Sequence, residues 1–259
     1  MNRGRLGFDS GEKKENAIVH LRPSPSPQFC IEFKNVTKRF GDQTVLDGVS
    51  FDVRKGEILA VVGPSGTGKS VTLKHIVGLL EPDAGEVVTQ TKQIGYLFQS
   101  GALLAWLTVG ENVALPLRET TDLSDAEIDR KVADALAAVE LTAAADKYPS
   151  EISGGMLKRA GLARAIVREV DTVLYDEPTS GLDPVTAGKI HQLIVRLNRE
   201  RGLTSVLVTH DLTSALKIAT RILLLMDGKV VTAAPPEEFV NSSAPEVRQF
   251  LAAMKGEEL

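Results

Sequence analysis

One short stretch of the chain, GPSGTGKS, carries the residue types that hold the phosphate groups of a nucleotide. It matches the pattern G-x-x-x-x-G-K-[ST], and its members are Gly63, Pro64, Ser65, Gly66, Thr67, Gly68, Lys69 and Ser70. The glycines let backbone N–H groups turn toward phosphate oxygens, Lys69 reaches the β and γ phosphates, and the Ser70 hydroxyl is a ligand for Mg²⁺. A strand expected before the motif and a helix after it favour nucleotide binding over an ordinary glycine turn.

Two adjacent carboxylates, Asp176 and Glu177, supply what hydrolysis requires beside a phosphate loop. Asp176 ends an apolar run and is placed to hold Mg²⁺ or its water ligands, and Glu177 to orient and deprotonate the attacking water. His210 follows another apolar run and would reach the γ-phosphate if its strand neighbours the other two. Taken alone, the carboxylates fit a surface pair and His210 fits a loop histidine, but the phosphate loop favours the hydrolytic interpretation.

The elements that position these groups alternate between strands and helices. Continuous apolar runs at residues 57–62, 171–177 and 204–210 predict strands buried on both faces. Helices are expected after the first two runs, the second of them beginning at Asp183 and Pro184. This alternation predicts an α/β fold with a mainly parallel sheet between helices.

Antiparallel strands are expected on either side of this arrangement. Residues 29–53 alternate apolar and polar side chains, and they predict short antiparallel strands with turns at Gly41-Asp42 and Asp47-Gly48. Toward the C-terminus, RILLLMDGKVVTA predicts a hairpin with an Asp-Gly turn.

Further helices are predicted in the middle of the chain. Ser124 and Glu127 form a capping box before an amphipathic stretch, and Ser153 is a candidate N-cap for a second helix. The start of that second helix, SGG, is also able to bind an anion.

The composition bounds the class of protein. The chain has 259 residues with 30 Lys and Arg against 34 Asp and Glu, so no overall basic field points to nucleic acid. Its longest apolar runs are about a quarter of the roughly 20 residues that span a bilayer. The first 28 residues are expected to form a flexible tail and not a secretory signal. The single cysteine, Cys30, is expected in the core and suits a reducing compartment.

Four further elements stand in a fixed order: Gln99, SGGM from Ser153 to Met156, DEPTSGLDP from Asp176, and TH at Thr209-His210. With the phosphate loop, they make residues 31–229 resemble the nucleotide-binding subunit of ABC transporters. The resemblance implies a P-loop NTPase core with an N-terminal antiparallel β subdomain and a helical signature subdomain. It also implies a head-to-tail homodimer with two ATP sites, each lying between the phosphate loop of one subunit and the SGG segment of the other.

The resemblance also implies a role for each residue of the site. Phe40 would stack on adenine, although a strand-end core residue is the alternative. Lys69 and Ser70 would hold phosphates and Mg²⁺, Asp176 would serve the metal, and Glu177 would be the general base. Gln99 would touch Mg²⁺ and the attacking water, and His210 would clamp the γ-phosphate. Contacts across the dimer would come from Ser153, Gly154, Gly155 and Asp183.

The resemblance also suggests a division of the chain. Residues 1–28 would be the flexible tail, 29–240 the ATPase domain with its helical subdomain at about 100–168, and 241–259 a C-terminal tail. That tail is expected either to pack against the neighbouring subunit or to form an exposed helix.

Other stretches point to a subclass. The signature usually reads L-S-G-G-Q, and Met156 here replaces its amide; ATP binding and hydrolysis should survive because Ser153 and the backbone N–H groups remain. FQSGAL, NVALPLRE, SGGMLKRAGLARAI and PEVRQFL resemble the ATPases of the Mla/Mce class, which energise lipid traffic across the bacterial envelope. The segment between Glu86 and Gln99 is shorter than expected for that class. LLAWLTVGENV resembles instead the importers of nitrate, taurine and sulfonate. A soluble ABC ATPase acting on nucleic acid or ribosomes is a third alternative.

The stretch after Gln99 is unusually apolar. Residues 99–107 include Leu103, Leu104, Trp106 and Leu107, and a tryptophan is the kind of anchor found at protein interfaces. We expect a groove here for an integral-membrane permease subunit, with core packing as the alternative. The resemblance then implies a peripheral protein at the cytoplasmic face of the inner membrane, with a lipid-binding Mce-type subunit in the complex and no nucleic acid.

Overall fold

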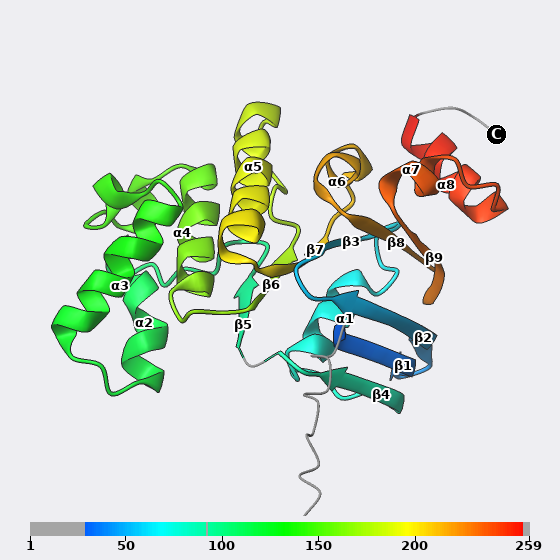
Figure 1. The fold of residues 1–259 in the computed structure, drawn as a ribbon, viewed down its shortest axis with the longest axis horizontal. Helices are drawn as coiled ribbons and strands as arrows, with labels where there is room; N and C mark the ends of the chain where they lie inside the picture. Colours follow the sequence, from blue (N-terminus) through cyan, green and yellow to red (C-terminus); the bar gives the residue numbers. More distant parts are fainter. Residues whose placement is uncertain (1–28, 92, 256–259) are drawn as a thin grey trace, which may run out of the picture.

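The computed structural model describes residues 29–91 and 93–255 in two sheets and their flanking helices (Figure 1). The predicted tail of residues 1–28 lies outside the described residues. The N-terminal sheet is antiparallel with the order β2-β1-β4. Its strands are β1 (Phe29–Phe40), β2 (Gln43–Arg54) and β4 (Ala84–Thr89).

The predicted antiparallel pair is confirmed, but one of its turns is not. Gly41 and Asp42 form the turn between β1 and β2. Asp47 and Gly48 lie within β2, where the pairing register with β1 shifts, so the prediction of a turn there is wrong. Gly48 has φ +64°, and a β-bulge uses such a glycine to add a residue without reversing the chain.

The second sheet has the order β5-β6-β7-β3-β8-β9, and all of its neighbouring strands are parallel except the final pair, β8 and β9. Its strands are β3 (Ile58–Val62), β5 (Ile94–Leu97), β6 (Thr172–Asp176), β7 (Thr204–Val208), β8 (Arg221–Met226) and β9 (Lys229–Ala234). Every residue of β3 and β7 is buried, as the continuous apolar runs predict. The predicted α/β class is therefore confirmed, and the Asp227-Gly228 turn joins the hairpin of β8 and β9.

Helices cover both faces of the parallel sheet (Figure 1). On one side, α1 (Lys69–Ile76) lies between the two sheets, and its Leu73 and Ile76 pack in one cluster with Phe33 and Val61. On the other side lie α5 (Pro184–Arg201) and α6 (Leu212–Ile218).

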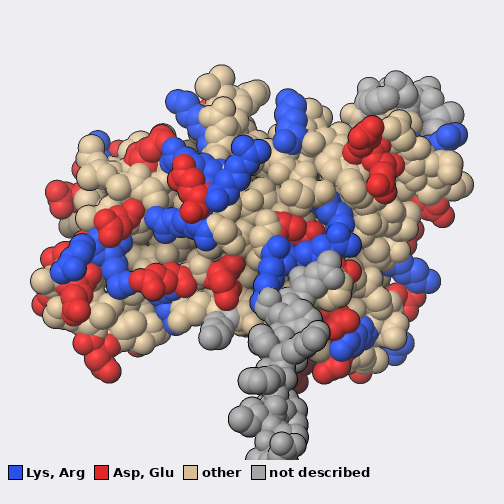
Figure 2. Space-filling model, viewed as in Figure 1, with Lys and Arg blue, Asp and Glu red and all other residues tan. Residues whose placement is uncertain are grey.

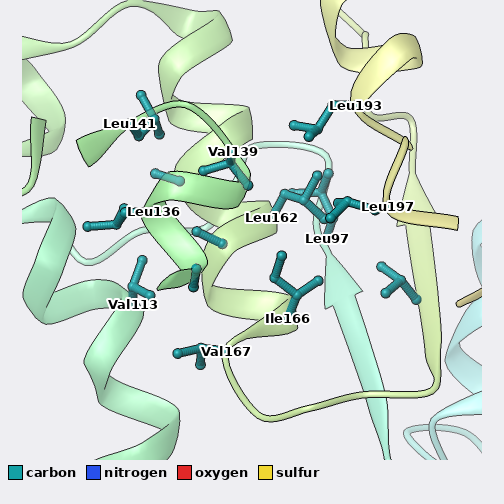
Figure 3. Packing of buried hydrophobic residues seen from close by; sticks show 14 of the residues in the cluster. Leu97, Val113, Leu136, Val139, Leu141, Leu162, Ile166, Val167, Leu193 and Leu197 are labelled. Carbon is teal, nitrogen blue, oxygen red and sulfur yellow. The ribbon is translucent and has the colours of Figure 1, made fainter. Parts of the chain in front are cut away.

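The helical subdomain packs beside β5 and β6 around one apolar cluster (Figure 3). Its elements are α2 (Val109–Thr120), α3 (Asp125–Ala138), the 3-10 turns η1 (Thr142–Ala144) and η2 (Pro149–Glu151), and α4 (Gly154–Ile166). Leu162 and Ile166 of α4 face Leu97 of β5 across this cluster, so the helices are tied to the strand that precedes Gln99.

The predicted helix starts are confirmed. Ser124 and Glu127 form the capping box of α3, and Ser153 accepts a hydrogen bond from the backbone N–H of Met156 at the start of α4. Asp183 caps α5 by accepting from the N–H groups of Val185 and Thr186. These caps satisfy N–H groups that have no partner within their own helix.

The chain ends in α7 (Pro236–Val240) and α8 (Pro245–Lys255), and α8 packs against its own domain. Val247 and Phe250 are buried beside Val62 and Phe239, so this segment is not the exposed helix that was one expectation. Cys30 is buried, as predicted. Among the residues that the structure describes, no helix is long and apolar enough to cross a membrane.

Replacing Phe250 with Ala should test how firmly α8 is held. The side chain is 6% exposed, and loss of a buried Phe should lower the free energy of unfolding by about 3 kcal/mol in urea denaturation. Met254→Ala, on the same helix at a residue 45% exposed, is the control and should change it by less than about 0.5 kcal/mol. Equal effects of the two substitutions would mean that α8 is not docked through Phe250.

Candidate nucleotide site

The phosphate loop, the paired carboxylates and the histidine meet at one edge of the parallel sheet. β7 lies between β3 and β6 and pairs with both in parallel. The carboxyl ends of parallel strands meet at the same edge, where ligands of such sheets bind. The expectation that the strand before His210 neighbours the other two is therefore confirmed.

The backbone of the phosphate loop needs glycine at two positions. Gly63 has φ +153°, and a Cβ there would lie 2.0 Å from the carbonyl oxygen of Leu225. Gly68 has φ +99°, and its Cβ would lie 2.7 Å from the Leu46 side chain. The loop is thus pressed against neighbouring elements in a backbone conformation that L side chains rarely adopt.

Lys69 and Ser70 begin α1, directly after the loop. The Lys69 ammonium group is buried and donates to the carbonyl oxygens of Gly63 and Pro64, at 2.8 Å each. Burial lowers the pKa of Lys69, and the charges of Glu177 and Asp176 oppose this shift. The cation is therefore held at the mouth of the loop with the two carboxylates nearby.

Both oxygens of Asp176 are engaged. The Ser70 hydroxyl donates to Oδ1 at 2.8 Å, so the two predicted metal-binding residues are in contact. The Tyr96 hydroxyl donates to Oδ2 at 3.1 Å, and burial raises the pKa of Tyr96. Tyr96 was not among the predicted site residues, although its place on the strand just before Gln99 was a signal that it lies beside the site.

Glu177 has an unusual backbone. Its φ is +49°, its N–H donates to the carbonyl of Val208 at 3.0 Å, and its side chain is 14% exposed. Such a conformation costs about 1–3 kcal/mol for a residue other than glycine and is concentrated at functional sites. Nδ1 of His210 lies 2.8 Å from Oε2 of Glu177, so the two side chains predicted to act on the γ-phosphate and its attacking water are in contact.

Gln99 shares a cleft with Asp176. Its side-chain amide donates to the Ser180 hydroxyl at 3.3 Å. A cleft of about 520 Å³ is lined by Phe98, Gln99, Ser100, Asp176 and Ser180. Gln99, the predicted sensor, and Asp176, the predicted metal ligand, therefore line the same cleft.

The remaining predicted residues lie apart from this cluster. A Cβ on Gly155 would lie 2.3 Å from the Thr186 side chain, which places the start of α4 against the start of α5, where Asp183 is the cap. Among the hydrogen bonds of the described residues, none joins Ser153 to the phosphate loop. Phe40 ends β1 and is 47% exposed, which excludes the core alternative for this residue.

The apolar stretch after Gln99 is partly buried and partly exposed. Leu103 is partly buried and packs against the helical cluster, whereas Trp106 is 72% exposed. Asn112 of α2 holds the backbone of the stretch, because its side-chain amide donates to the carbonyl oxygens of Leu104 and Leu107 at 3.0 and 3.1 Å.

The donor set fits a nucleotide with its metal. A backbone with no room for a side chain at Gly63 and Gly68, a lysine at the mouth of the loop, and hydroxyl and carboxylate oxygens in contact suit phosphate groups and a hard cation. The fold and this site define a P-loop nucleotide-binding protein.

Comparison with known proteins narrows this class. Residues 46–180 match the family model described as ABC transporter. The chain is 42% identical to the intermembrane phospholipid transport system ATP-binding protein MlaF of Haemophilus influenzae, over 89% of this chain and 92% of that protein. It is 40% identical to the probable ribonucleotide transport ATP-binding protein mkl of Mycobacterium leprae, over 86% of this chain and 68% of that protein. The chain belongs to the ABC transporter family and is an MlaF-like ATP-binding and ATP-hydrolysing subunit.

Solved structures agree with this assignment. The dimeric post-hydrolysis state of the ATP-binding cassette MJ0796, bound to ADP and Pi, superposes with a TM-score of 0.72 at 34% identity, covering 80% of this chain and 98% of that one. The fold of cbiO1 from Clostridium perfringens also matches, with a TM-score of 0.77 at 24% identity and coverage of 88% and 96%.

Proposed function

We propose that this chain is the ATPase subunit of a system that transports phospholipid across the bacterial envelope. The observation that carries the proposal is the similarity to MlaF, which extends over nearly the whole length of both proteins. The MlaF of Escherichia coli is also 40% identical over 85% of this chain. The name of mkl gives ribonucleotides as a competing cargo. The purification experiment below distinguishes phospholipid from ribonucleotide as the cargo.

Within each subunit, the cluster at the sheet edge binds and hydrolyses ATP. The phosphate loop and Lys69 hold the phosphates, and Phe40 stacks on adenine from its exposed position at the end of β1. Ser70, Asp176 and Gln99 would hold Mg²⁺, which when bound would neutralise charge on the phosphates.

Glu177 and His210 act on the reacting groups. Glu177 is the general base that takes a proton from the attacking water, and its largely buried carboxylate lies against His210. His210 contacts this carboxylate and lies at the end of the neighbouring strand, which suits it to hold the γ-phosphate beside the base. Gln99 orients the water and senses whether the γ-phosphate is present.

A second copy of the chain completes each site. Ser153 and Gly154 are exposed at the start of α4, Gly155 is buried behind them, and Asp183 lies next to this helix start at the start of α5. In the head-to-tail homodimer they meet the nucleotide bound by the other subunit. The dimeric form of the MJ0796 cassette supports this arrangement.

The membrane partner docks at residues 99–107. Trp106 and Phe98 are exposed, at 72% and 40%, on the segment that carries Gln99. A movement of Gln99 on loss of the γ-phosphate would therefore be passed to a permease subunit bound there. Acidic and basic side chains are interspersed over the face in Figure 2, which favours a protein partner over nucleic acid. The protein then lies at the cytoplasmic face of the inner membrane, in a complex with a lipid-binding Mce-type subunit.

Glu177→Gln should abolish turnover and trap ATP-bound dimers. The substitution keeps the size and backbone of the residue but removes the base, so ATP still binds while the attacking water is not deprotonated. Steady-state ATPase assays and gel filtration with ATP measure both effects. Glu86→Gln, on exposed β4, is the control and should leave both unchanged. An undiminished rate in Glu177→Gln would refute its assignment as base.

Affinity purification of the full chain from membranes should recover an integral-membrane permease, a Mce-type subunit and bound phospholipid, all identified by mass spectrometry. A receptor for nitrate, sulfonate or ribonucleotides in the complex would contradict the phospholipid cargo. A solely ribosomal or monomeric soluble distribution would contradict the transporter assignment for this chain.

Trp106→Glu should release the permease from the purified complex while leaving ATP binding intact, because a charge cannot replace a large apolar anchor at an interface. Leu79→Glu is a matched control, since Leu79 is also apolar and 63% exposed but lies outside residues 99–107. Loss of ATP binding in Trp106→Glu with the permease still bound would show that Trp106 supports the nucleotide site instead.

A further inference from the structure

Helix α4 places a buried lysine between the two loops that carry Gln99 and Glu177. Lys158 is 6% exposed, and its ammonium group donates hydrogen bonds to the backbone carbonyl of Gln99 and, at 3.2 Å, to that of Glu177. Lysine is rarely buried without compensation of its charge. Because both acceptors are main-chain atoms, these bonds fix where the two loops lie and leave the Gln99 and Glu177 side chains free to act.

A second cation of α4 fastens the rest of the first loop. The Arg164 guanidinium donates to the carbonyl oxygens of Ala102 at 2.7 Å and Gly101 at 3.0 Å. The helix also approaches the loop closely, since a Cβ on Gly161 would lie 2.9 Å from the Gly101 carbonyl oxygen. Residues 99–102 are thus held against α4 along their backbone.

Lys158 differs from Arg164 because it also reaches the second loop. The peptide around Glu177 is fixed on one side by its N–H bond to Val208, and on the other its carbonyl accepts from Lys158 and from the N–H of Ser180, at 3.2 Å each. This matters because Glu177 has φ +49°, a conformation that persists only when the surroundings hold it. Burial lowers the pKa of Lys158, and the nearby carboxylates of Glu177 and Asp176 oppose that shift.

The geometry points to Lys158 as a positioning residue that sets the places of Gln99 and Glu177 relative to each other and to α4. This inference rests on the proposed function, which assigns the hydrolytic step to those two side chains. The helix that carries Lys158 begins at Gly154, directly after Ser153. The element proposed to meet the second subunit's nucleotide therefore also holds the hydrolytic groups of its own subunit.

The test is the ATPase kinetics of the full chain carrying Lys158→Met. Methionine retains the apolar stem of lysine but donates no hydrogen bond, so the carbonyls of Gln99 and Glu177 lose their common partner. Displacing reacting groups by about an ångström lowers kcat on the order of 100-fold. KM and the dissociation constant for ATP should stay unchanged, because the phosphate loop and Lys69 bind the nucleotide. Lys158→Arg keeps the charge and the donors and should restore most of kcat.

Arg159→Met is the matched control. Arg159 is the next residue of α4, and its guanidinium also donates to two backbone carbonyls, those of Val139 and Glu140, but at the end of α3. Equal kcat in Lys158→Met and Arg159→Met would overturn the inference, and so would a loss of ATP affinity in Lys158→Met that matches its loss of kcat. If Lys158→Met does not fold, the same comparison is made between Lys158→Gln and Arg159→Gln.

Glu177→Gln in the same series separates the two proposals. Full turnover in Glu177→Gln would refute the proposed function, whatever Lys158→Met does. Loss of turnover in Glu177→Gln together with normal turnover in Lys158→Met would refute only the positioning role of Lys158.

Discussion

The site depends on the insertion of β7 between β3 and β6, hydrogen-bonded in parallel to both. The three strands are distant in sequence, and the parallel pairing turns their carboxyl ends to the same edge. The phosphate loop, the paired carboxylates and His210 each follow one of these ends, so the order of strands alone brings them together. Every residue of β7 is buried, which fixes the strand between its neighbours and with it the place of His210.

Two buried cations surround the carboxylates at this edge. Lys69 belongs to α1 and Lys158 to α4. The negative charges of Asp176 and Glu177 raise the pKa of both lysines, against the effect of burial. Each ammonium group donates hydrogen bonds to backbone carbonyls. These bonds compensate its charge without a hydrogen bond to a carboxylate oxygen. The carboxylates are thereby left to other partners: Asp176 to Ser70 and Tyr96, Glu177 to His210. This separation suits a metal ligand and a base that must act independently.

Local patterns predict most of the elements and the phosphate loop, because both follow from short-range chemistry. The caps at Ser124, Ser153 and Asp183 and the buried runs of β3, β6 and β7 are of this kind. The expectation that His210 lies beside the phosphate loop depended on the order of the strands in the sheet, and an apolar run does not specify that order. The bulge at Asp47-Gly48 resembles a turn in sequence because glycine at positive φ serves both.

Other features depend on contacts between distant segments and have no local signature. Tyr96 meets Asp176 because β5 and β6 are adjacent, and Lys158 meets Gln99 because α4 packs over the end of β5. A lysine on a helix ordinarily indicates a solvated face, and only the packing of α4 shows that this one is buried. In the same way, the burial of Val247 and Phe250 follows from the packing of α8 beside β9 and α7. From the sequence pattern alone, this segment was expected either to pack against the neighbouring subunit or to be an exposed helix.

Met156 stands where the signature usually has glutamine, and α4 tolerates this change because different groups of the helix have different roles. The groups at its start that suit an anion are backbone N–H groups and the Ser153 hydroxyl, and none of them belongs to the side chain at position 156. The Met156 N–H still donates to Ser153 at 3.3 Å, so the cap is formed, while its thioether packs against the helical cluster. Met156 thus contributes an apolar contact between α4 and its own subdomain. The same helix carries Lys158, whose ammonium group donates to the backbone carbonyl of Gln99.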